Sequence, residues 1–200
     1  RRIGEMKKIK RIFKFQPFSQ KQRMVLNWWC KNSPVKDSDG IIADGAIRSG
    51  KTVSMSLSFI MWAMSSFNGE NFAMCGKTIG SFRRNVLSGL KMMLRSRGYT
   101  VADHRADNLV IITKGDATNY FYIFGGKDER SQDLIQGITL AGVFFDEVAL
   151  MPESFVNQAT GRCSVDGSKY WFNCNPDGPY HWFKTEWIDK RKGKHLLYLH

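Results

Sequence analysis

The apolar positions of the chain fall into short continuous runs separated by longer segments with helical spacing, a pattern that predicts alternating strands and helices. The strand-like runs lie at residues 40–43, 71–76, 108–113, 119–124, 138–145, 169–174 and 195–199. The helical segments lie at residues 19–31, 52–67, 79–96 and 152–161. Alternation of this kind is typical of an α/β fold built on a mostly parallel sheet.

Local signals place several boundaries of these elements. Ser19 and Gln22 have the S-x-x-Q spacing of a capping box, so a helix is expected to begin there. The runs at 108–113 and 119–124 are separated by five residues, which predicts a β-hairpin. Residues 125–136 are polar and are expected to form a connection.

Composition fits a single folded unit. The 200 residues are 42% hydrophobic and 13% aromatic, which allows a sizeable core and excludes a disordered chain. We predict one domain over residues 19–200, preceded by a basic segment at residues 1–18. The cysteines have neither C-x-x-C pairing nor ligand-spaced histidines, so a reducing cytosol fits better than a zinc or disulfide framework. The longest uncharged stretch, 52–68, is too short and polar to span a bilayer, and no signal peptide is expected.

The chain is strongly basic, with a net charge of +12. Such a charge suggests an acidic polymer or a membrane surface as partner. The cations gather at the two ends, where the alternative interpretation is a pair of solvated tails. They are Arg1, Arg2, Lys7, Lys8, Lys10, Arg11 and Lys14, and then Lys184, Lys190, Arg191, Lys192 and Lys194.

A phosphate-binding loop follows the apolar run at 40–43. It reads Gly45-Ala46-Ile47-Arg48-Ser49-Gly50-Lys51-Thr52, a complete G-x-x-x-x-G-K-[ST] motif. Its glycines allow backbone N–H groups to point at phosphates, and the next helix adds its positive N-terminal end. We expect Lys51 to reach the β- and γ-phosphates and Thr52 to hold Mg²⁺. The motif therefore predicts binding of ATP and magnesium, with Gly45, Arg48, Ser49, Gly50, Lys51 and Thr52 as the binding residues.

An acidic pair ends the later apolar run at 138–145. Hydrolysis of a triphosphate needs a carboxylate that holds the water shell of Mg²⁺ and a base that orients the attacking water. We assign these roles to Asp146 and Glu147, and expect them at the tip of a strand beside the phosphate-loop strand. The alternative is an acidic strand end facing solvent. An adjacent glutamate separates the chain from nucleotide kinases and small GTPases and favours RecA-like motor ATPases.

Together these motifs resemble one family. The set comprises residues 18–22 (Phe-Ser-Gln-Lys-Gln), the phosphate loop, Gln136-Gly137 ahead of 145–149 (Phe-Asp-Glu-Val-Ala), and residues 173–176 (Asn-Cys-Asn-Pro). It is similar to the ATPase domain of a phage terminase large subunit, closest to the PBSX-like group. The resemblance implies a three-layer P-loop NTPase of the RecA-like (ASCE) type with a β-hairpin insertion.

The resemblance also implies a function. Members form a homo-oligomeric ring on the viral portal and hydrolyse ATP to push double-stranded DNA into a procapsid. Portal protein and terminase small subunit are the implied partners, without a membrane, in the cytoplasm of the bacterial host. An RNase H-like nuclease domain is expected outside this chain. Other RecA-like nucleic-acid-dependent ATPases, a P-loop kinase and a non-catalytic nucleotide-gated assembly module stay as alternatives.

Several residues keep two interpretations. Gln22 resembles the glutamine that reads the adenine edge, and it also fits the reciprocal cap. Arg48 can offer forked hydrogen bonds to the γ-phosphate or form a salt bridge. Asn173 and Asn175 can sense the γ-phosphate and couple hydrolysis to movement, as the family's coupling motif does, or can set a turn.

Ring ATPases commonly receive a catalytic arginine from a neighbouring subunit, and the sequence leaves several candidates for this residue. Candidates are Arg130, Arg83, Arg84 and Arg162. Terminases often have an arginine just before the glycine of the segment leading to Asp-Glu, but this chain has Gln136 there, which shifts weight to Arg48 and Arg130. Contacts to the DNA backbone are plausible for Lys91, Arg95, Arg97 and the terminal basic runs.

Overall fold

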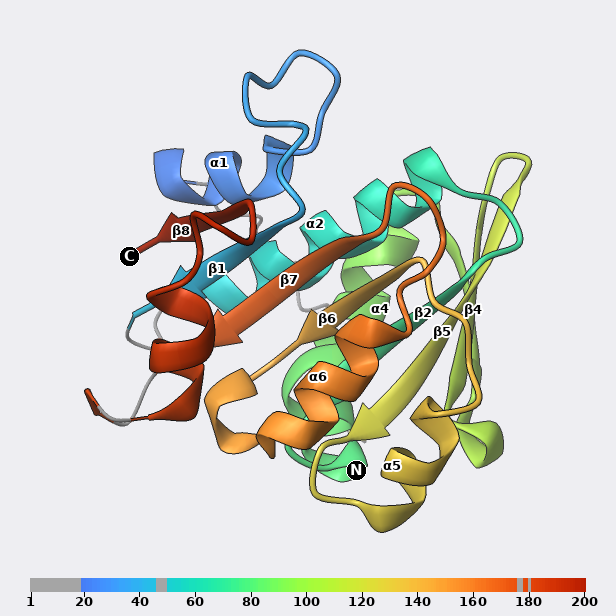
Figure 1. Ribbon diagram of the computed structural model, residues 1–200. Helices are drawn as coiled ribbons and strands as arrows, with labels where there is room; N and C mark the ends of the chain where they lie inside the picture. Colours follow the sequence, from blue (N-terminus) through green and yellow to red (C-terminus); the bar gives the residue numbers. More distant parts are fainter. Residues whose placement is uncertain (1–18, 46–49, 176–177, 180) are drawn as a thin grey trace, which may run out of the picture.

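The structure, a computed structural model, describes residues 19–45, 50–175, 178–179 and 181–200. Its centre is an eight-stranded sheet in the order β3-β4-β5-β2-β6-β7-β1-β8 (Figure 1). The strands are β1 (Gly40–Asp44), β2 (Asn71–Gly76), β3 (Thr100–His104), β4 (Leu109–Lys114), β5 (Ala117–Gly125), β6 (Gly142–Phe145), β7 (Lys169–Cys174) and β8 (Leu196–Leu199). Within this sheet β4 runs antiparallel to both neighbours and the other pairings are parallel, so the predicted mostly parallel sheet is confirmed.

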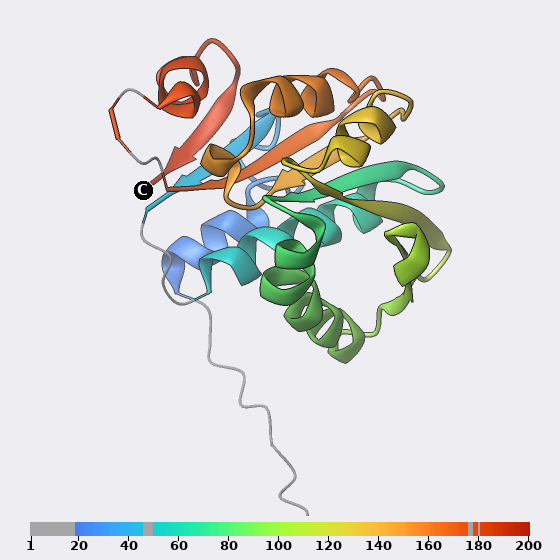
Figure 2. The same cartoon turned by 90° about the horizontal axis from the view of Figure 1, so that it is seen from below.

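Helices cover both faces of the sheet and complete a three-layer architecture (Figure 2). One face carries α1 (Gln20–Asn27), α2 (Lys51–Ser66), and a long helix made of α3 (Ile79–Phe82), the π-helical turn η1 (Arg83–Leu87) and α4 (Ser88–Ser96). The other face carries α5 (Glu129–Ile135), α6 (Glu153–Gly161) and the π-helical turn η4 (Lys184–Ile188). The short 3-10 turns η2 (Arg105–Asp107) and η3 (Val148–Leu150) lie in connections. None of the described helices is long and apolar enough to cross a membrane.

Burial on both faces explains why the central strands read as continuous apolar runs. Successive side chains point to opposite faces of a sheet. In β7, Trp171 packs into the core beneath α2, whereas Phe172 packs into the core beneath α6 and η4. Phe144 and Phe145 of β6 divide between the two cores in the same way.

The helix α2 is fixed to the sheet by aromatic packing. Phe59 is fully buried, and its ring lies 5.4 to 6.1 Å from five other aromatic rings, four of which belong to the strands. Ser58 accepts hydrogen bonds from the indoles of Trp29 and Trp171 at 3.2 and 3.1 Å, and donates one to the Val25 carbonyl at 2.7 Å. The helix that begins at Lys51 is therefore held firmly under the strand ends.

Strand order corrects one expectation about the site. Asp146 does not end a strand directly beside the phosphate-loop strand, because β7 pairs with both β1 and β6 and separates them. β7 is apolar on both faces, as a central strand requires. In register, Asn173 lies opposite Ala43, so its side chain is placed between the phosphate loop and Asp146.

Other differences concern local structure. The helix predicted over 19–31 ends at Asn27, because Cys30 N–H bonds to the Asn27 carbonyl at 3.0 Å and closes a three-residue turn in place of the next helical bond. The strand predicted over 138–145 begins only at Gly142. The polar segment 125–136 contains α5, whose buried residues are Ser131 and Ile135, too few to give an apolar pattern.

At the far edge of the sheet, β3 is missing from the predicted strands, because most of its residues are polar or exposed. The predicted hairpin is confirmed as β4–β5, and β5 also pairs in parallel with β2. It is therefore continuous with the central sheet. The four cysteines are free thiols, as far as the described residues reach.

Candidate functional site

The phosphate loop begins where β1 ends and finishes where α2 begins. Gly45 and Gly50 have φ values of +145° and +90°, which only glycine adopts without strain. The sequence requirement for glycine at these two positions therefore has a backbone cause. Arg48 and Ser49 lie outside the described residues, so their predicted roles stay predictions.

Lys51 lies at the mouth of this loop. Its Nζ donates hydrogen bonds to the carbonyl oxygens of Gly45 at 3.1 Å and Cys174 at 3.0 Å. Burial lowers the pKa of Lys51, and the Cys174, Asp44 and Asp146 side chains act in the opposite direction. The ammonium is thus held between the ends of β1 and β7, where phosphate oxygens would meet it.

One amide connects the two groups expected to hold magnesium. Asn173 Nδ2 donates to Thr52 Oγ1 at 3.2 Å and to Asp146 Oδ1 at 2.8 Å. Asn173 Oδ1 is buried and has no hydrogen-bond partner among the described residues. A buried polar atom without a partner is costly and points to a ligand or ion at that place.

These residues fit a magnesium ion. Mg²⁺ prefers hard oxygen ligands, keeps several of its waters, and is commonly held by one or two protein groups together with substrate phosphates. Thr52 offers a hydroxyl, Asp146 a carboxylate, and Asn173 the unpartnered oxygen. No cluster of three or more His, Cys, Asp or Glu side chains suited to a metal occurs in the part of the chain that the structure describes.

Asp146 is unusually basic for a carboxylic acid. The residue is 6% exposed, and burial raises its pKa to about 6, helped by the charge of Glu147 and opposed by the Asn173 hydrogen bond and Lys51. The folded state therefore keeps a proton that the unfolded state has released between pH about 4 and 6. The contribution of Asp146 to the stability of the metal-free protein therefore rises as pH falls through this range.

Asp146→Asn is expected to stabilise the protein in EDTA at pH 8, because it replaces a buried, ionised carboxylate with a neutral group of the same shape. The gain is on the order of 2–3 kcal/mol, from about 1.4 kcal/mol per pKa unit. It shrinks steadily below pH 6, where Asp146 itself becomes neutral. Urea unfolding at pH 8 and pH 5 measures both values, with Asp133→Asn on the exposed side of α5 as control. An unchanged or pH-independent stability would contradict the assigned cause.

Glu147 has a strained backbone. Its φ is +52°, a left-handed conformation that non-glycine residues adopt rarely and that gathers at functional sites. Its side chain lines a cavity of about 280 Å³ at the carboxyl ends of β6 and β7. The full lining is Thr52, Asn85, Asp146, Glu147, Ala149, Leu150, Asn173, Cys174 and Asn175. The structure thus brings together Thr52, Asp146, Glu147 and Asn175 as the sequence predicts.

Gln22 lies on the other side of the loop. It forms both halves of the predicted capping box, since Ser19 N donates to Gln22 Oε1 at 2.8 Å and Gln22 N donates to Ser19 Oγ at 3.3 Å. A Cβ atom on Gly50 would collide with Gln22 Nε2, so the amide touches the phosphate loop. Gln22 can cap the helix and contact a nucleotide at the same time. Its contact with the adenine stays a prediction.

The candidate arginines lie outside the cavity. Arg130 is exposed on α5, beyond the end of β5, and does not line the cavity. Arg83 is 9% exposed and pairs with Asp103, which leaves it poorly placed to reach a neighbouring subunit. Arg84 is exposed and Arg162 is half-buried. A role for Arg130 from a neighbouring subunit therefore stays a prediction.

Two residues beside the loop are absent from the sequence-based site. Tyr198 of β8 donates a hydrogen bond to Asp44, the last residue of β1, and the guanidinium of Arg191 lies 4.7 Å from the Tyr198 ring. Burial and the bond to Asp44 raise the pKa of Tyr198 to about 12. Asp44 could have been included in the predicted site, because it directly precedes Gly45. Tyr198 could not, because it is 154 residues from Asp44 in the sequence and no local motif marks it.

Comparison with known proteins identifies relatives of this arrangement. A family model described as the N-terminal part of the T4likevirus-type terminase large subunit matches residues 42–195. The large terminase of a thermophilic bacteriophage is 71% identical, with a TM-score of 0.91 over 92% of this chain and 46% of that chain. This chain therefore spans less than half of that relative. A search of curated proteins gives no match.

Two further structures extend the comparison. The same thermophilic-phage large terminase in complex with ATP-gamma-S is 67% identical, with a TM-score of 0.87 over 92% of this chain and 44% of that chain. The large terminase ATPase domain of Thermus phage P74-26 is 17% identical, with a TM-score of 0.61 over 82% of this chain and 76% of that chain. At that identity the likeness concerns the fold alone.

Proposed function

Because the chain belongs to the terminase large-subunit family, whose N-terminal part it matches, we propose that it is an ATPase that powers packaging of double-stranded viral DNA into a procapsid. Residues 19–200 form the ATPase domain and residues 1–18 a basic segment before it. The relative from the thermophilic bacteriophage has been solved with ADP and with ATP-gamma-S, which supports a nucleotide at the phosphate loop of this chain.

The arrangement of Thr52, Asn173 and Asp146 is the observation that carries the proposal. It aligns the start of α2 with the end of β6, and Glu147 lines the same cavity. Bound Mg²⁺ would neutralise charge on the β- and γ-phosphate oxygens. Thr52 would hold the ion directly, and Asp146 would hold it through its waters.

Glu147 and Lys51 would carry out the chemical step of hydrolysis. The oxygen of a water molecule forms a bond to the γ-phosphorus, the bond from that phosphorus to the bridging oxygen breaks, and its electron pair stays on ADP. Glu147 takes the proton of the water, and Lys51 stabilises the charge on the phosphates. Glu147 lines the cavity together with Thr52, where it would be placed to accept that proton.

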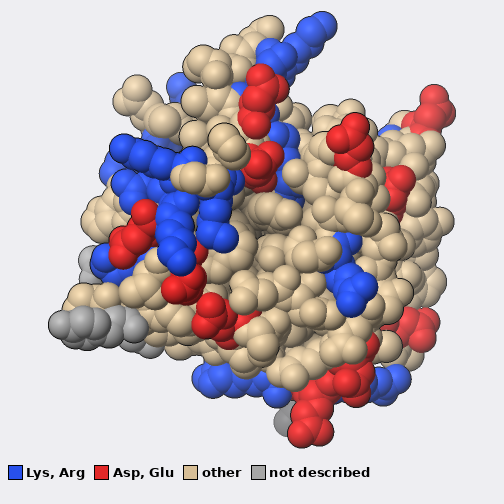
Figure 3. Space-filling model, viewed as in Figure 1, with Lys and Arg blue, Asp and Glu red and all other residues tan. Residues whose placement is uncertain are grey.

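Partners follow from the family and from charge. We propose double-stranded DNA, a portal protein, a terminase small subunit and neighbouring copies of this chain, in the cytoplasm of the bacterial host. Lys190, Lys192 and Lys194 are exposed just before β8, where Lys and Arg side chains gather in Figure 3. Lys190 pairs with Glu186 but keeps 58% of its side chain exposed, whereas Lys91, paired with Asp103, is only 23% exposed and Arg95 bonds to the Val101 carbonyl. The turn before β8 is therefore the better candidate for DNA phosphates.

Phosphate release from ATP tests the proposal. We expect ADP and free phosphate, with a rate that rises with protein concentration if a neighbouring subunit supplies an arginine, and that changes on addition of duplex DNA. Transfer of the phosphoryl group to an acceptor would support a kinase. ATP-dependent oligomerisation without phosphate release at any protein concentration would support a nucleotide-gated assembly module. Either result would overturn the proposed function.

A further inference from the structure

One residue of the catalytic cavity comes from an element that neither the phosphate loop nor the Asp146-Glu147 pair includes. Asn85 lies in the middle of the π-helical turn η1, which interrupts the helix running from Ile79 to Ser96. It lines the same cavity as Thr52 and Glu147. π-helical turns within α-helices are uncommon and occur frequently at functional sites.

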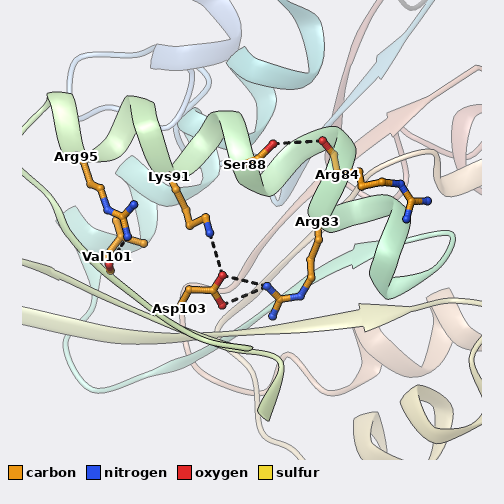
Figure 4. A network of polar contacts seen from close by, with 7 residues as sticks. All are labelled: Arg83, Arg84, Ser88, Lys91, Arg95, Val101 and Asp103. Carbon is orange, nitrogen blue, oxygen red and sulfur yellow. Dashed lines mark hydrogen bonds and ion pairs between the residues drawn. The ribbon is translucent and has the colours of Figure 1, made fainter. Parts of the chain in front are cut away.

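The neighbours of Asn85 fix the turn in place. Arg83 Nη1 donates to both carboxylate oxygens of Asp103 at 3.2 and 3.0 Å, and Lys91 Nζ donates to Asp103 at 3.0 Å (Figure 4). Val86 and Leu87, which follow Asn85, are buried in the core. The backbone is therefore anchored on both sides of a side chain that faces the cavity.

Asn85 is left available by this packing. Its side chain is exposed, and it takes part in none of the hydrogen bonds found among the described residues. Arg84, the residue before it, points away from Asp103 (Figure 4) and does not line the cavity. A carboxamide carries both an acceptor oxygen and a donor nitrogen. It can therefore accept a hydrogen bond from a water molecule and donate one to a phosphate oxygen at the same time.

We propose that Asn85 is a positioning residue for hydrolysis, which holds the attacking water and a γ-phosphate oxygen in line while Glu147 takes the proton. The proposal rests on the proposed function, because it concerns the same reaction. Asn85 exchanges no proton itself. Its contribution is orientation, which acts on the transition state more than on bound nucleotide.

Asn85→Ala separates this role from a structural one. We expect kcat to fall by about 10- to 100-fold, since one oriented hydrogen-bond donor is commonly worth this much or more. The Kd for ADP should stay within about twofold, whereas affinity for ADP with aluminium fluoride, which mimics the transferring phosphoryl group, should fall with kcat. Ser88→Ala, at an exposed position three residues further on whose hydroxyl bonds to the Arg84 carbonyl, is the matched control.

Two results would overturn the proposal. One is a kcat of wild-type size in Asn85→Ala; the other is an equal loss of affinity for ADP and for its fluoride complex. If the alanine variant does not fold, Asn85→Leu keeps a side chain of similar size without charge or hydrogen-bonding groups, and the same comparison applies to it. If the wild-type chain releases no phosphate at all, the proposed function fails, and the fluoride comparison still decides the role of Asn85 because it needs no turnover.

Discussion

Glu147→Gln lowers kcat by between about 10²- and 10⁴-fold, the usual contribution of a general base, while the affinity for ATP stays within a few-fold. Glutamine has the shape of glutamate and can still hydrogen-bond a water, but it cannot take its proton. The side chain lines the cavity beside Thr52 and Asp146, which the substitution leaves unchanged. Single-turnover hydrolysis and equilibrium binding of ATP-gamma-S measure the two quantities separately.

Two further variants serve as controls for the loss of kcat in Glu147→Gln. Glu153→Gln removes a carboxylate from an exposed position at the start of α6, six residues further along the chain, and is expected to leave both quantities unchanged. Lys51→Ala, by contrast, should weaken binding and turnover together, because its ammonium meets the phosphates in the ground state as well. Wild-type turnover in Glu147→Gln would remove Glu147 as the base.

The strained backbone of Glu147 gives this prediction a structural reason. A left-handed conformation at a non-glycine residue costs on the order of 1–3 kcal/mol and persists where the surroundings impose it. Glu147 N–H helps to stabilise the Asp146 carboxylate, and Leu150 N donates to the Glu147 carbonyl at 3.0 Å. The same short segment therefore directs Asp146 toward Asn173 and Glu147 into the cavity.

The parts of the site that sequence could predict are those encoded by contiguous residues. The phosphate loop and the Asp146-Glu147 pair can be recognised in the sequence, because backbone geometry and metal chemistry restrict the residue types at fixed spacing. Asn85 and Tyr198 do not stand at a fixed sequence distance from either motif. They reach the site through a helix register and an edge strand, which depend on packing across the whole sheet.

The same distinction holds for the fold. Strands buried on both faces, such as β2 and β7, are predicted to the residue, because their apolar runs are continuous. The edge strand β3 and the short helix α5 bury too few side chains to leave a pattern. The order of the strands is set by packing between segments far apart in the sequence. The sequences of β1 and β6 therefore do not show that β7 lies between them.

Phe59→Ala is expected to lower the free energy of unfolding by about 3–5 kcal/mol, the cost of removing a phenyl ring from a packed core. Phe59 is fully buried, and its ring contacts Trp62 of its own helix and Phe72, Phe121, Phe144 and Trp171 of four strands. The alanine would leave a cavity that these large rings cannot close. Urea unfolding followed by tryptophan fluorescence measures the loss.

The location of Phe59 makes this result informative about the site as well as the core. The residue lies about two turns along the helix that begins at Lys51, so its packing fixes where Lys51 and Thr52 meet the ends of β6 and β7. Met92→Ala, at a side chain 57% exposed on α4, is the control and should change stability by less than about 0.5 kcal/mol. A loss below about 1 kcal/mol in Phe59→Ala would contradict the packing, since total stability of such a domain is only about 5–15 kcal/mol. Nucleotide affinity should fall in the folded variant too, because a loosened α2 no longer holds Lys51 and Thr52 at one fixed distance from Asp146.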